Sequence, residues 1–188
     1  MGSIDQQGPV TEDIKPAPTT VYGVTKTAGE LLGSVYNSLY GMEVVSLRIT
    51  EVYGPGLWMP SLLGDMIRAG LRGEVFKLEA GGDHPFQFVY VDDVATAARL
   101  ASTTPSLTQQ AYFVSGGHRM TVSETAELLQ KHLPAACFEI GPGFLPQWDR
   151  QVEFDLTASA RDLGYVPRWS IEEGLEKQID WIRSTENL

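Results

Sequence analysis

The sequence predicts an α/β fold, and two observations support that class. Short apolar runs that are typical of buried strands alternate along the chain with longer segments in which apolar residues recur at helical spacing. Several of the helical segments are preceded by Ser, Thr or Asp, the residues that commonly cap a helix. Because strands that alternate with helices favour a parallel sheet covered by helices, we expect one α/β domain, for which 188 residues are enough.

The first helix is predicted from near Thr20 to Tyr40, after a polar, Pro-rich loop over residues 4–20. Gly41 follows directly and favours a helix end there, because glycine adopts the left-handed backbone conformation at low cost. The apolar residues at helical spacing in this segment are Val24, Ala28, Leu31, Leu32, Val35 and Leu39.

A strand, a turn and a second helix are predicted next. Val44 to Ile49 is typical of a short buried strand, and Tyr53-Gly54-Pro55-Gly56 of a turn. Helical spacing then runs from Leu62 to Leu71. The residues predicted to face inward are Leu62, Leu63, Met66 and Ile67.

The next predicted strand, Phe88 to Val91, leads directly into a helix that runs to about Ala101. We expect Asp92 or Asp93 to cap this helix. Tyr112 to Val114 is predicted to be a further short strand.

Two later helices begin with a capping-box sequence, Thr121-Val122-Ser123-Glu124 and Ser170-Ile171-Glu172-Glu173. Their predicted inward residues are Val122, Ala126, Leu129, Leu133, Leu175, Ile179 and Ile182. The Gly- and Pro-containing stretch from Phe138 to Gln147 is predicted to be a loop, and Cys137 a small buried residue.

Composition excludes several classes of function. A formal net charge of -10 argues against a nucleic-acid binder. The single cysteine excludes an intramolecular disulfide, and with three scattered histidines it argues against a structural zinc site, so we expect no metal. No apolar stretch is long enough to span a bilayer and no secretory signal is evident, which favours a cytoplasmic protein.

Tyr22 and Lys26 are the first candidates for chemistry, because a spacing of four places them on one face of the first helix. A free phenol has a pKa of ~10 and is a poor base at neutral pH, but a nearby ammonium stabilises the phenolate. Such a tyrosine can take a proton from an alcohol or return one to a carbonyl, while a nicotinamide carries the hydride. The alternative is an ordinary Tyr–Lys pair on a solvated helix face.

The glycine-rich loop that cradles a dinucleotide is absent from the sequence. Gly54-Pro55-Gly56 and Gly141-Pro142-Gly143 lie in Pro-containing turns without a third glycine at the required place. The chain therefore carries a candidate acid/base pair without the usual phosphate-binding loop.

Four motifs resemble, in order, those of extended short-chain dehydrogenases/reductases of the NAD-dependent epimerase/dehydratase family. The segment from Pro18 to Glu30 resembles the family's active-site helix. The other three motifs are Ser46-Leu47-Arg48 with Val52-Tyr53-Gly54-Pro55-Gly56, then Phe88-Val89-Tyr90-Val91-Asp92-Asp93-Val94-Ala95, then Asp155 with Leu163-Gly164-Tyr165-Val166-Pro167 and Ser170 to Leu175. The resemblance implies a partial Rossmann-like parallel sheet with the family's C-terminal substrate-binding subdomain.

The resemblance also implies roles for individual residues. Tyr22 would be the general acid/base, and Lys26 would assist it and bind the nicotinamide ribose of NAD or NADP. Ser3 can be placed at the family's catalytic hydroxyl, with an ordinary terminal serine as the alternative. Ile49 and Thr50 would contact the cofactor.

Three positions depart from the family pattern, which has Asn, Arg and Arg where this chain has Glu51, Phe86 and Leu145. Those residues normally hold a substrate diphosphate, so we expect a sugar or related small substrate that is not a nucleotide sugar. The alternative is that Arg119 or Arg150 replaces the lost contacts.

Glu51 and Phe86 would then face the substrate, and Trp58 and His84 are further candidates for that side. For Trp58 the alternative is a half-buried loop aromatic. For His84 it is a solvated turn histidine.

The resemblance implies that residues 1–188 form a single C-terminal portion of such an enzyme. The Tyr–Lys helix occupies about 20–40, and the substrate-binding part lies mainly in 54–80 and 116–188. The expected function is NAD(P)-dependent epimerase/dehydratase chemistry. The alternatives are an inactive truncated fragment with an association role and a simple carbonyl reductase.

The partners expected from this resemblance are a small-molecule substrate and either a second copy of the chain or a missing N-terminal half. Leu31, Val35 and Leu39 would suit a dimer interface or core packing, and core packing is the prediction.

Overall fold

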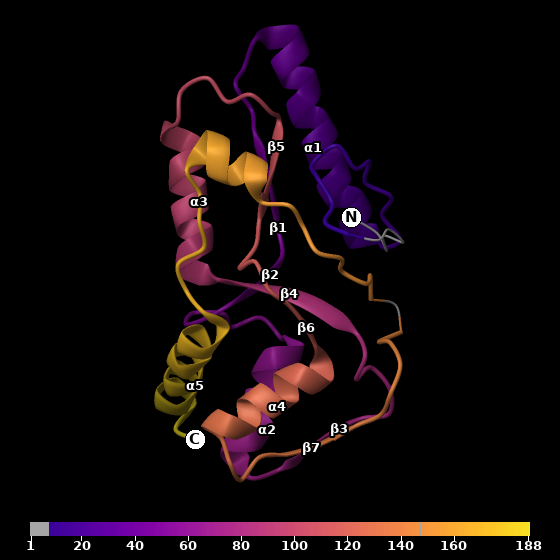
Figure 1. The fold of residues 1–188 in the computed structure, drawn as a ribbon, viewed down its shortest axis with the longest axis vertical. Helices are drawn as coiled ribbons and strands as arrows, with labels where there is room; N and C mark the ends of the chain where they lie inside the picture. Colours follow the sequence, from indigo (N-terminus) through magenta and orange to yellow (C-terminus); the bar gives the residue numbers. More distant parts are fainter. Residues whose placement is uncertain (1–7, 147) are drawn as a thin grey trace.

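A computed structural model of the chain describes residues 8–146 and 148–188, and its elements form an upper and a lower part (Figure 1). The upper part contains α1 (Val21–Tyr40), β1 (Ser46–Ile49), α3 (Val91–Thr103), β5 (Ala111–Val114) and the π-helix η1 (Ser159–Leu163). The lower part contains α2 (Leu62–Arg72), β3 (Val75–Leu78), α4 (Val122–His132), β7 (Cys137–Ile140) and α5 (Ile171–Glu186). Between them run β2 (Glu51–Tyr53), β4 (Pro85–Tyr90) and β6 (Arg119–Thr121).

The strands pair mostly in parallel, as the α/β prediction requires. β1 pairs with β5 in parallel, with Ser46 opposite Ala111. β2 pairs in parallel with β4, which pairs antiparallel with β6, and β3 pairs in parallel with β7. β1 ends at Ile49 and β2 begins at Glu51, with only Thr50 between them. The two strands therefore connect the upper sheet directly to the middle one.

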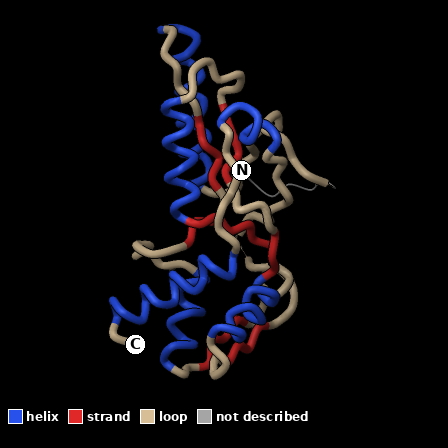
Figure 2. The backbone as a smooth tube through the Cα atoms, turned by 60° about the vertical axis from the view of Figure 1, so that its left-hand side comes forward, coloured by secondary structure: helices blue, strands red, loops and turns tan. Residues whose placement is uncertain are grey.

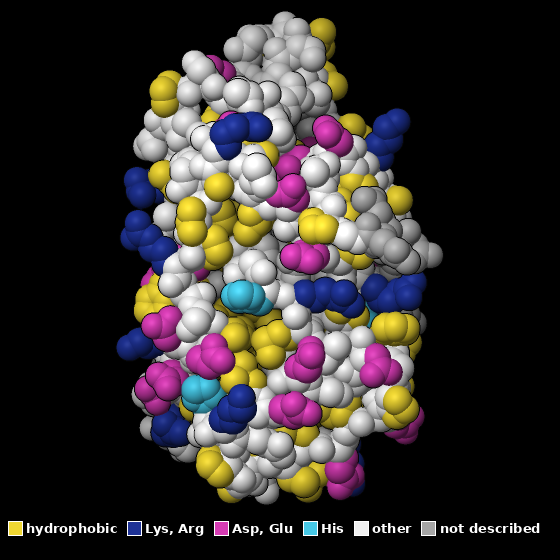
Figure 3. Space-filling model, in the orientation of Figure 1, with side chains coloured by type: hydrophobic (Ala, Val, Ile, Leu, Met, Phe, Trp, Pro, Cys, Tyr) yellow, Lys and Arg dark blue, Asp and Glu magenta, His cyan; other side chains and the backbone are white. Residues whose placement is uncertain are grey.

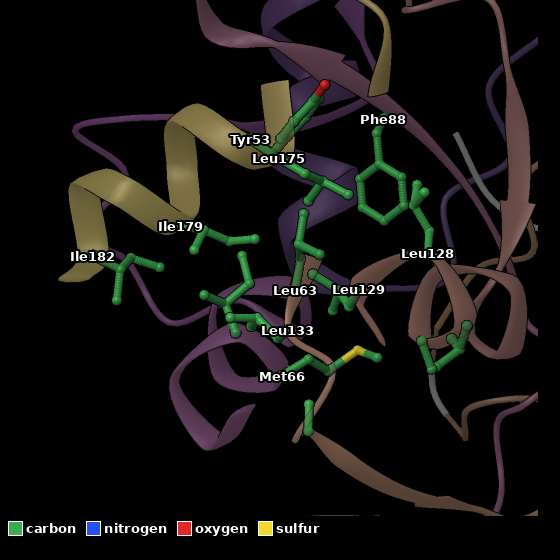
Figure 4. Close-up of a cluster of buried hydrophobic side chains, with 14 of the residues drawn as sticks. Tyr53, Leu63, Met66, Phe88, Leu128, Leu129, Leu133, Leu175, Ile179 and Ile182 are labelled. Carbon is green, nitrogen blue, oxygen red and sulfur yellow. The ribbon is translucent and has the colours of Figure 1, made fainter. Parts of the chain in front are cut away.

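Two hydrophobic clusters stabilise the two parts. In the lower one, side chains from α2, α4 and α5 converge on Tyr53 and Phe88 of the middle sheet (Figure 4). Its labelled members are Tyr53, Leu63, Met66, Phe88, Leu128, Leu129, Leu133, Leu175, Ile179 and Ile182. The upper cluster contains Val89, Ala97, Tyr112, Val114, Ala158, Leu163 and Tyr165. The predicted inward faces of α2, α4 and α5 are confirmed, apart from Leu62, which is only partly buried.

Helix α1 has the predicted ends but not the predicted burial. The Thr20 side chain accepts a hydrogen bond from the Gly23 N–H at 3.0 Å, and Gly41 adopts the left-handed conformation. Within α1, which is described in full, Gly33 alone is buried. Leu31 and Leu39 are 63% and 69% exposed, so the prediction of core packing is wrong for this face, because no element of the described chain covers it.

The two aspartates that follow β4 do not cap α3. The N-cap is Tyr90, which makes no side-chain cap hydrogen bond. Asp93 is instead buried, and its carboxylate accepts hydrogen bonds from the backbone N–H groups of Arg168 and Trp169 at 3.1 and 3.3 Å. The helix-cap prediction is therefore wrong, because the segment that leads into α5 supplies better donors than the first turn of α3.

The predicted loop from Phe138 to Gln147 begins with a strand, β7, and this part of the prediction is wrong. Phe138 and Ile140 pack against the lower cluster, while Cys137 points outward and is exposed rather than buried. Residues 137–140 form a strand because they pair with β3. Neither of the two segments predicts this pairing by itself. Both capping boxes, at Thr121 and Ser170, are confirmed.

A second view shows helices and short strands packed together at the end of the molecule where the C-terminus lies (Figure 2). On the face drawn in Figure 3, acidic and basic side chains are interspersed with exposed apolar ones. In residues 8–146 and 148–188, no helix combines the length and the hydropathy that crossing a bilayer requires.

Candidate active site

The first turns of α1 bring Tyr22 and Lys26 together, as their spacing predicts. The Lys26 ammonium lies 5.0 Å from the centre of the Tyr22 ring, a cation–π contact. Tyr22 is 71% exposed, so its hydroxyl is accessible to a ligand. Among the described residues the Lys26 ammonium has no hydrogen-bond or ion-pair partner, which leaves its N–H donors available.

Both side chains line a cleft of about 720 Å³, a volume within the usual range of small-molecule sites. One wall is α1, and the floor is the junction of β1 and β2, including Ile49, Thr50 and Glu51. The opposite wall contains Phe86 and residues 148–151. The cleft therefore collects six residues predicted from the sequence: Tyr22, Lys26, Ile49, Thr50, Glu51 and Phe86.

An ion pair fixes α1 against β1. The Arg48 guanidinium donates to both oxygens of the Glu30 carboxylate, at 2.5 and 3.1 Å, and also donates to the Glu12 carbonyl at 2.7 Å. These bonds hold Glu30, which lies one turn beyond Lys26, at a defined distance from the strand. Arg48 and Glu30 thus position the helix that carries the candidate acid/base pair.

The opposite wall is held by residues far away in the sequence. The Thr19 hydroxyl donates to Asp149 at 2.6 Å, which joins the beginning of α1 to this wall. The backbone N–H of Gln87 donates to the Gln151 side chain at 2.7 Å, which joins the wall to β4. The sequence did not single out Trp148 or Asp149, because their place in the cleft depends on these long-range contacts.

Glu51 is the acidic group at the floor of the cleft. Burial raises the pKa of its carboxyl above the ordinary value of 4.5, since desolvation disfavours the charged form. Within the described part of the chain, no hydrogen bond or ion pair reaches this carboxyl. A carboxyl without donors at the floor of a cleft can accept hydrogen bonds from a ligand.

His84 lies beneath the aromatic rings of the same region. It is fully buried, and its ring lies 5.0 Å from Phe86, 6.4 Å from Phe144 and 6.5 Å from Trp148 between centroids. Burial lowers the pKa of the imidazole. The solvated-turn interpretation of His84 is therefore wrong, and the residue is not among the described residues that line the cleft.

The other predicted site residues lie elsewhere. Trp58 is 85% exposed, not half-buried, and is not among the described lining residues. Ser3 falls outside the described residues. Arg150 lines the cleft, with its guanidinium 5.0 Å from the Phe144 ring centre, whereas Arg119 lies on β6 beside Gln87.

The geometry permits proton transfer. A phenol and an ammonium share one wall of a cleft that can hold a small molecule, and the Glu51 carboxyl lies at its floor. A tyrosine in such a place can exchange a proton with a hydroxyl of a ligand.

Comparison with known proteins identifies relatives of the chain. Residues 1–115 match the model of the NAD dependent epimerase/dehydratase family. The dTDP-L-rhamnose 4-epimerase of Burkholderia thailandensis is 29% identical, over 89% of this chain and 47% of its own length. The UDP-glucuronate 4-epimerase of Thermodesulfobacterium geofontis is 27% identical, over 97% of this chain and 56% of its own length. The chain thus spans about half the length of these curated relatives.

Solved structures agree with the fold. The UDP-glucuronic acid 4-epimerase of Bacillus cereus, in complex with UDP-glucuronic acid and NAD, is similar with a TM-score of 0.86 and 26% identity. The similarity covers 95% of this chain and 57% of that one. The UDP-glucose 4-epimerase of Thermotoga maritima, with UDP-glucose, has a TM-score of 0.87 at 26% identity, over 98% of this chain and 60% of that one. These α/β structures confirm the Rossmann-like class, and their sugar nucleotides give no support to the expected substrate without a nucleotide.

Proposed function

This chain belongs to the NAD dependent epimerase/dehydratase family, and from that premise we propose that it supplies the acid/base half of a nicotinamide-dependent reaction at a sugar hydroxyl. The observation that carries the proposal is the pairing of Tyr22 with Lys26 on the wall of a cleft of about 720 Å³. The substrate class follows the sugar nucleotides bound by the similar structures.

Tyr22 acts as the general base and acid. Its phenolate takes the proton of the substrate hydroxyl as that carbon is oxidised, and its phenol returns the proton when the carbonyl is reduced. The Lys26 ammonium stabilises the phenolate by its positive charge. Ile49 and Thr50, at the floor of the cleft, limit where the reacting carbon can lie.

The described residues fit the nicotinamide-ribose end of a dinucleotide. Among the described residues nothing bonds to the N–H donors of the Lys26 ammonium, so they are available for ribose hydroxyls, and the cleft beside it has a volume of about 720 Å³. A nicotinamide held beside Lys26 would supply the hydride acceptor for oxidation of the carbon whose hydroxyl meets Tyr22. NAD is proposed rather than NADP because the similar structures contain NAD.

A second role, in association, is supported by the exposed apolar side of α1. Leu31, Leu32 and Leu39 are all more than half exposed on a helix that lies beside the cleft. Since a surface of this kind is uncommon on an isolated soluble chain, we propose that a second polypeptide surface covers it in the working protein.

The test uses reduced nicotinamide mononucleotide and NADH, titrated into the 188-residue chain by their fluorescence. The mononucleotide lacks the adenosine half, so its binding does not depend on a glycine-rich phosphate loop. We expect Lys26→Ala to weaken both ligands by about tenfold or more, because a charge-assisted hydrogen bond is lost. Lys131→Ala, an exposed lysine on α4, is the matched control. Equal binding by wild type and Lys26→Ala would contradict the assignment of Lys26.

A further inference from the structure

His84 lies beneath the cleft wall that contains Trp148. Its side chain is fully buried, and neither ring nitrogen makes a hydrogen bond of normal geometry within the described part of the chain. Its backbone is held on both sides, because the N–H donates to the Gly81 carbonyl at 2.9 Å and the carbonyl accepts from the Val122 N–H at 3.1 Å. The imidazole can therefore reach water only if the side chains that cover it move away.

Three aromatic rings pack against the imidazole, and they differ in how firmly they are held. Phe86, at 5.0 Å between centroids, belongs to β4 and is 3% exposed. Phe144 and Trp148, at 6.4 and 6.5 Å, follow β7 and are 50% and 47% exposed. Because one side of each of these two rings already faces water, both can leave the imidazole without any change in the middle sheet.

Two hydrogen bonds hold the chain on either side of these two rings. The Gly143 N–H donates to the Asp83 carboxylate at 2.6 Å, just before Phe144. The Gln87 N–H donates to the Gln151 side chain at 2.7 Å, just after Trp148. Neither bond involves the imidazole, so both can persist when the ring becomes charged. A movement of Phe144 and Trp148 is therefore confined between two fixed points.

A positive charge on His84 is disfavoured where the ring lies. Burial is the largest cause that lowers the imidazole pKa below the ordinary value of 6.5, and the Arg150 guanidinium acts in the same direction. The Asp149 backbone and carboxylate raise the pKa, but they offset only part of this effect. The other charged groups of the elements around the ring are the carboxylates of Asp83 and Glu124, each of which accepts a backbone N–H. Protonation of a ring in this position therefore opposes its burial.

We propose that His84 is an acid-sensitive latch for this wall: Phe144 and Trp148 pack over the neutral imidazole, and they move away when the ring takes up a proton. In the open state the ring is hydrated and regains the ordinary pKa of 6.5. The closed state is therefore fully favoured above pH 6.5, and the ratio of closed to open falls by up to about tenfold per pH unit below it. The inference rests on the proposed function only for its consequence, which is that acid opens the cleft on the side lined by Trp148.

The test follows Trp148 by fluorine NMR in the 188-residue chain, labelled with 5-fluorotryptophan, between pH 8 and pH 5. The chain has four tryptophans, and Trp148→Phe identifies the signal of interest by its loss. We expect that signal to shift in a transition of one proton with its midpoint below pH 6.5, while circular dichroism shows that the helices persist. No ligand is present, so this result and the binding of NADH succeed or fail separately.

His84→Gln, whose side chain cannot take up a proton in this range, should abolish the transition. Two matched controls should keep it: His118→Gln changes an exposed histidine, and Glu51→Gln removes the other group whose pKa burial shifts in the cleft. The proposal is overturned if the Trp148 signal is constant from pH 8 to pH 5, if His84→Gln retains the transition, or if Glu51→Gln abolishes it. Should His84→Gln not fold, carbon NMR of wild type labelled at its three histidine rings decides, since titration of all three at pH 6.5 or above would also overturn the proposal.

Discussion

At the scale of single residues, Glu51 and Asp93 show two outcomes for a buried acid. Asp93 is 2% exposed and has two backbone donors, so its charge is compensated. Glu51 is partly buried in the cleft without a donor in the described chain, and burial raises its pKa. The first arrangement contributes to stability, whereas the second reduces stability and leaves an acceptor for a ligand.

The raised pKa of Glu51 predicts a pH-dependent loss of stability. Between the ordinary value of 4.5 and the raised folded value, the folded state holds this proton more tightly than the unfolded state. The free energy of unfolding contributed by Glu51 therefore falls as pH rises through that window. Glu51→Gln should remove this loss, so the variant gains stability over wild type as pH rises above 4.5, measured by urea unfolding at successive pH values. An unchanged difference at every pH would contradict the prediction, and Glu127→Gln is the control.

The hydrogen bonds that the buried Asp93 carboxylate accepts should contribute measurably to the free energy of unfolding. Asp93→Ala should lower the free energy of unfolding by about 1–3 kcal/mol, because the N–H groups of Arg168 and Trp169 lose their acceptor. Asp92→Ala, the exposed neighbour, should change it by less than about 0.5 kcal/mol. Urea unfolding compares the two, and equal losses would show that the buried contacts are not the cause.

How far the sequence predicted the site depends on whether the contacts are local. The pairing of Tyr22 with Lys26 depends only on helical spacing, which the sequence contains. The place of Trp148 in the cleft depends on contacts across more than sixty residues, such as Gln87 with Gln151, and no local pattern encodes them.

At the scale of elements, the beginnings of α1, α4 and α5 were predictable because their caps are local, whereas the cap predicted for α3 was wrong. Thr20, Thr121 and Ser170 each accept the hydrogen bond expected of an N-cap, within three residues of their own position. Burial was less predictable, as the exposed apolar face of α1 shows, since it depends on which surface packs there. The pairing of β3 with β7 was missed for the same reason.

The space around two helical glycines, Gly174 in α5 and Gly29 in α1, predicts opposite effects of an alanine on stability. A Cβ on Gly174 would lie 2.7 Å from Cε2 of the Tyr53 ring, which is buried and cannot move away. Gly174→Ala should therefore destabilise the protein by about 1–3 kcal/mol, despite the higher helix propensity of alanine. Gly29→Ala in α1 meets nothing within 4 Å and should stabilise by up to about 1 kcal/mol. Thermal unfolding distinguishes them, and a stabilising Gly174→Ala would contradict the packing.

At the scale of the whole molecule, the cleft lies at the junction of the two parts. Tyr22 and Lys26 come from the upper part, while Phe86 comes from the middle sheet that packs on the lower cluster. Because only Thr50 separates β1 from β2, the α1 wall of the cleft and the wall that contains Phe86 lie close together. The α/β class could be predicted from alternating patterns, but this arrangement of separate small sheets could not, because register between distant strands is not a local property.

The exposed side of α1 predicts self-association of the chain. In sedimentation velocity, wild type should populate a species larger than the monomer as concentration increases, because exposed apolar surface favours association. Replacing Leu31, Val35 and Leu39 together by Ser should shift the population to monomer. Val166→Ser, which changes an exposed apolar residue elsewhere, should not. A wild-type monomer at every concentration would contradict the prediction.

The central claim is that the Tyr22 and Lys26 wall of the cleft receives the nicotinamide ribose. Nuclear Overhauser effects between reduced nicotinamide mononucleotide and the tyrosine rings of the chain, isotopically labelled at tyrosine, test it most directly, with Tyr22→Phe identifying the Tyr22 signal. The account predicts a contact between the ribose protons and the Tyr22 ring that Lys26→Ala weakens. Contacts to other tyrosines alone, or no contact at all, would contradict the account.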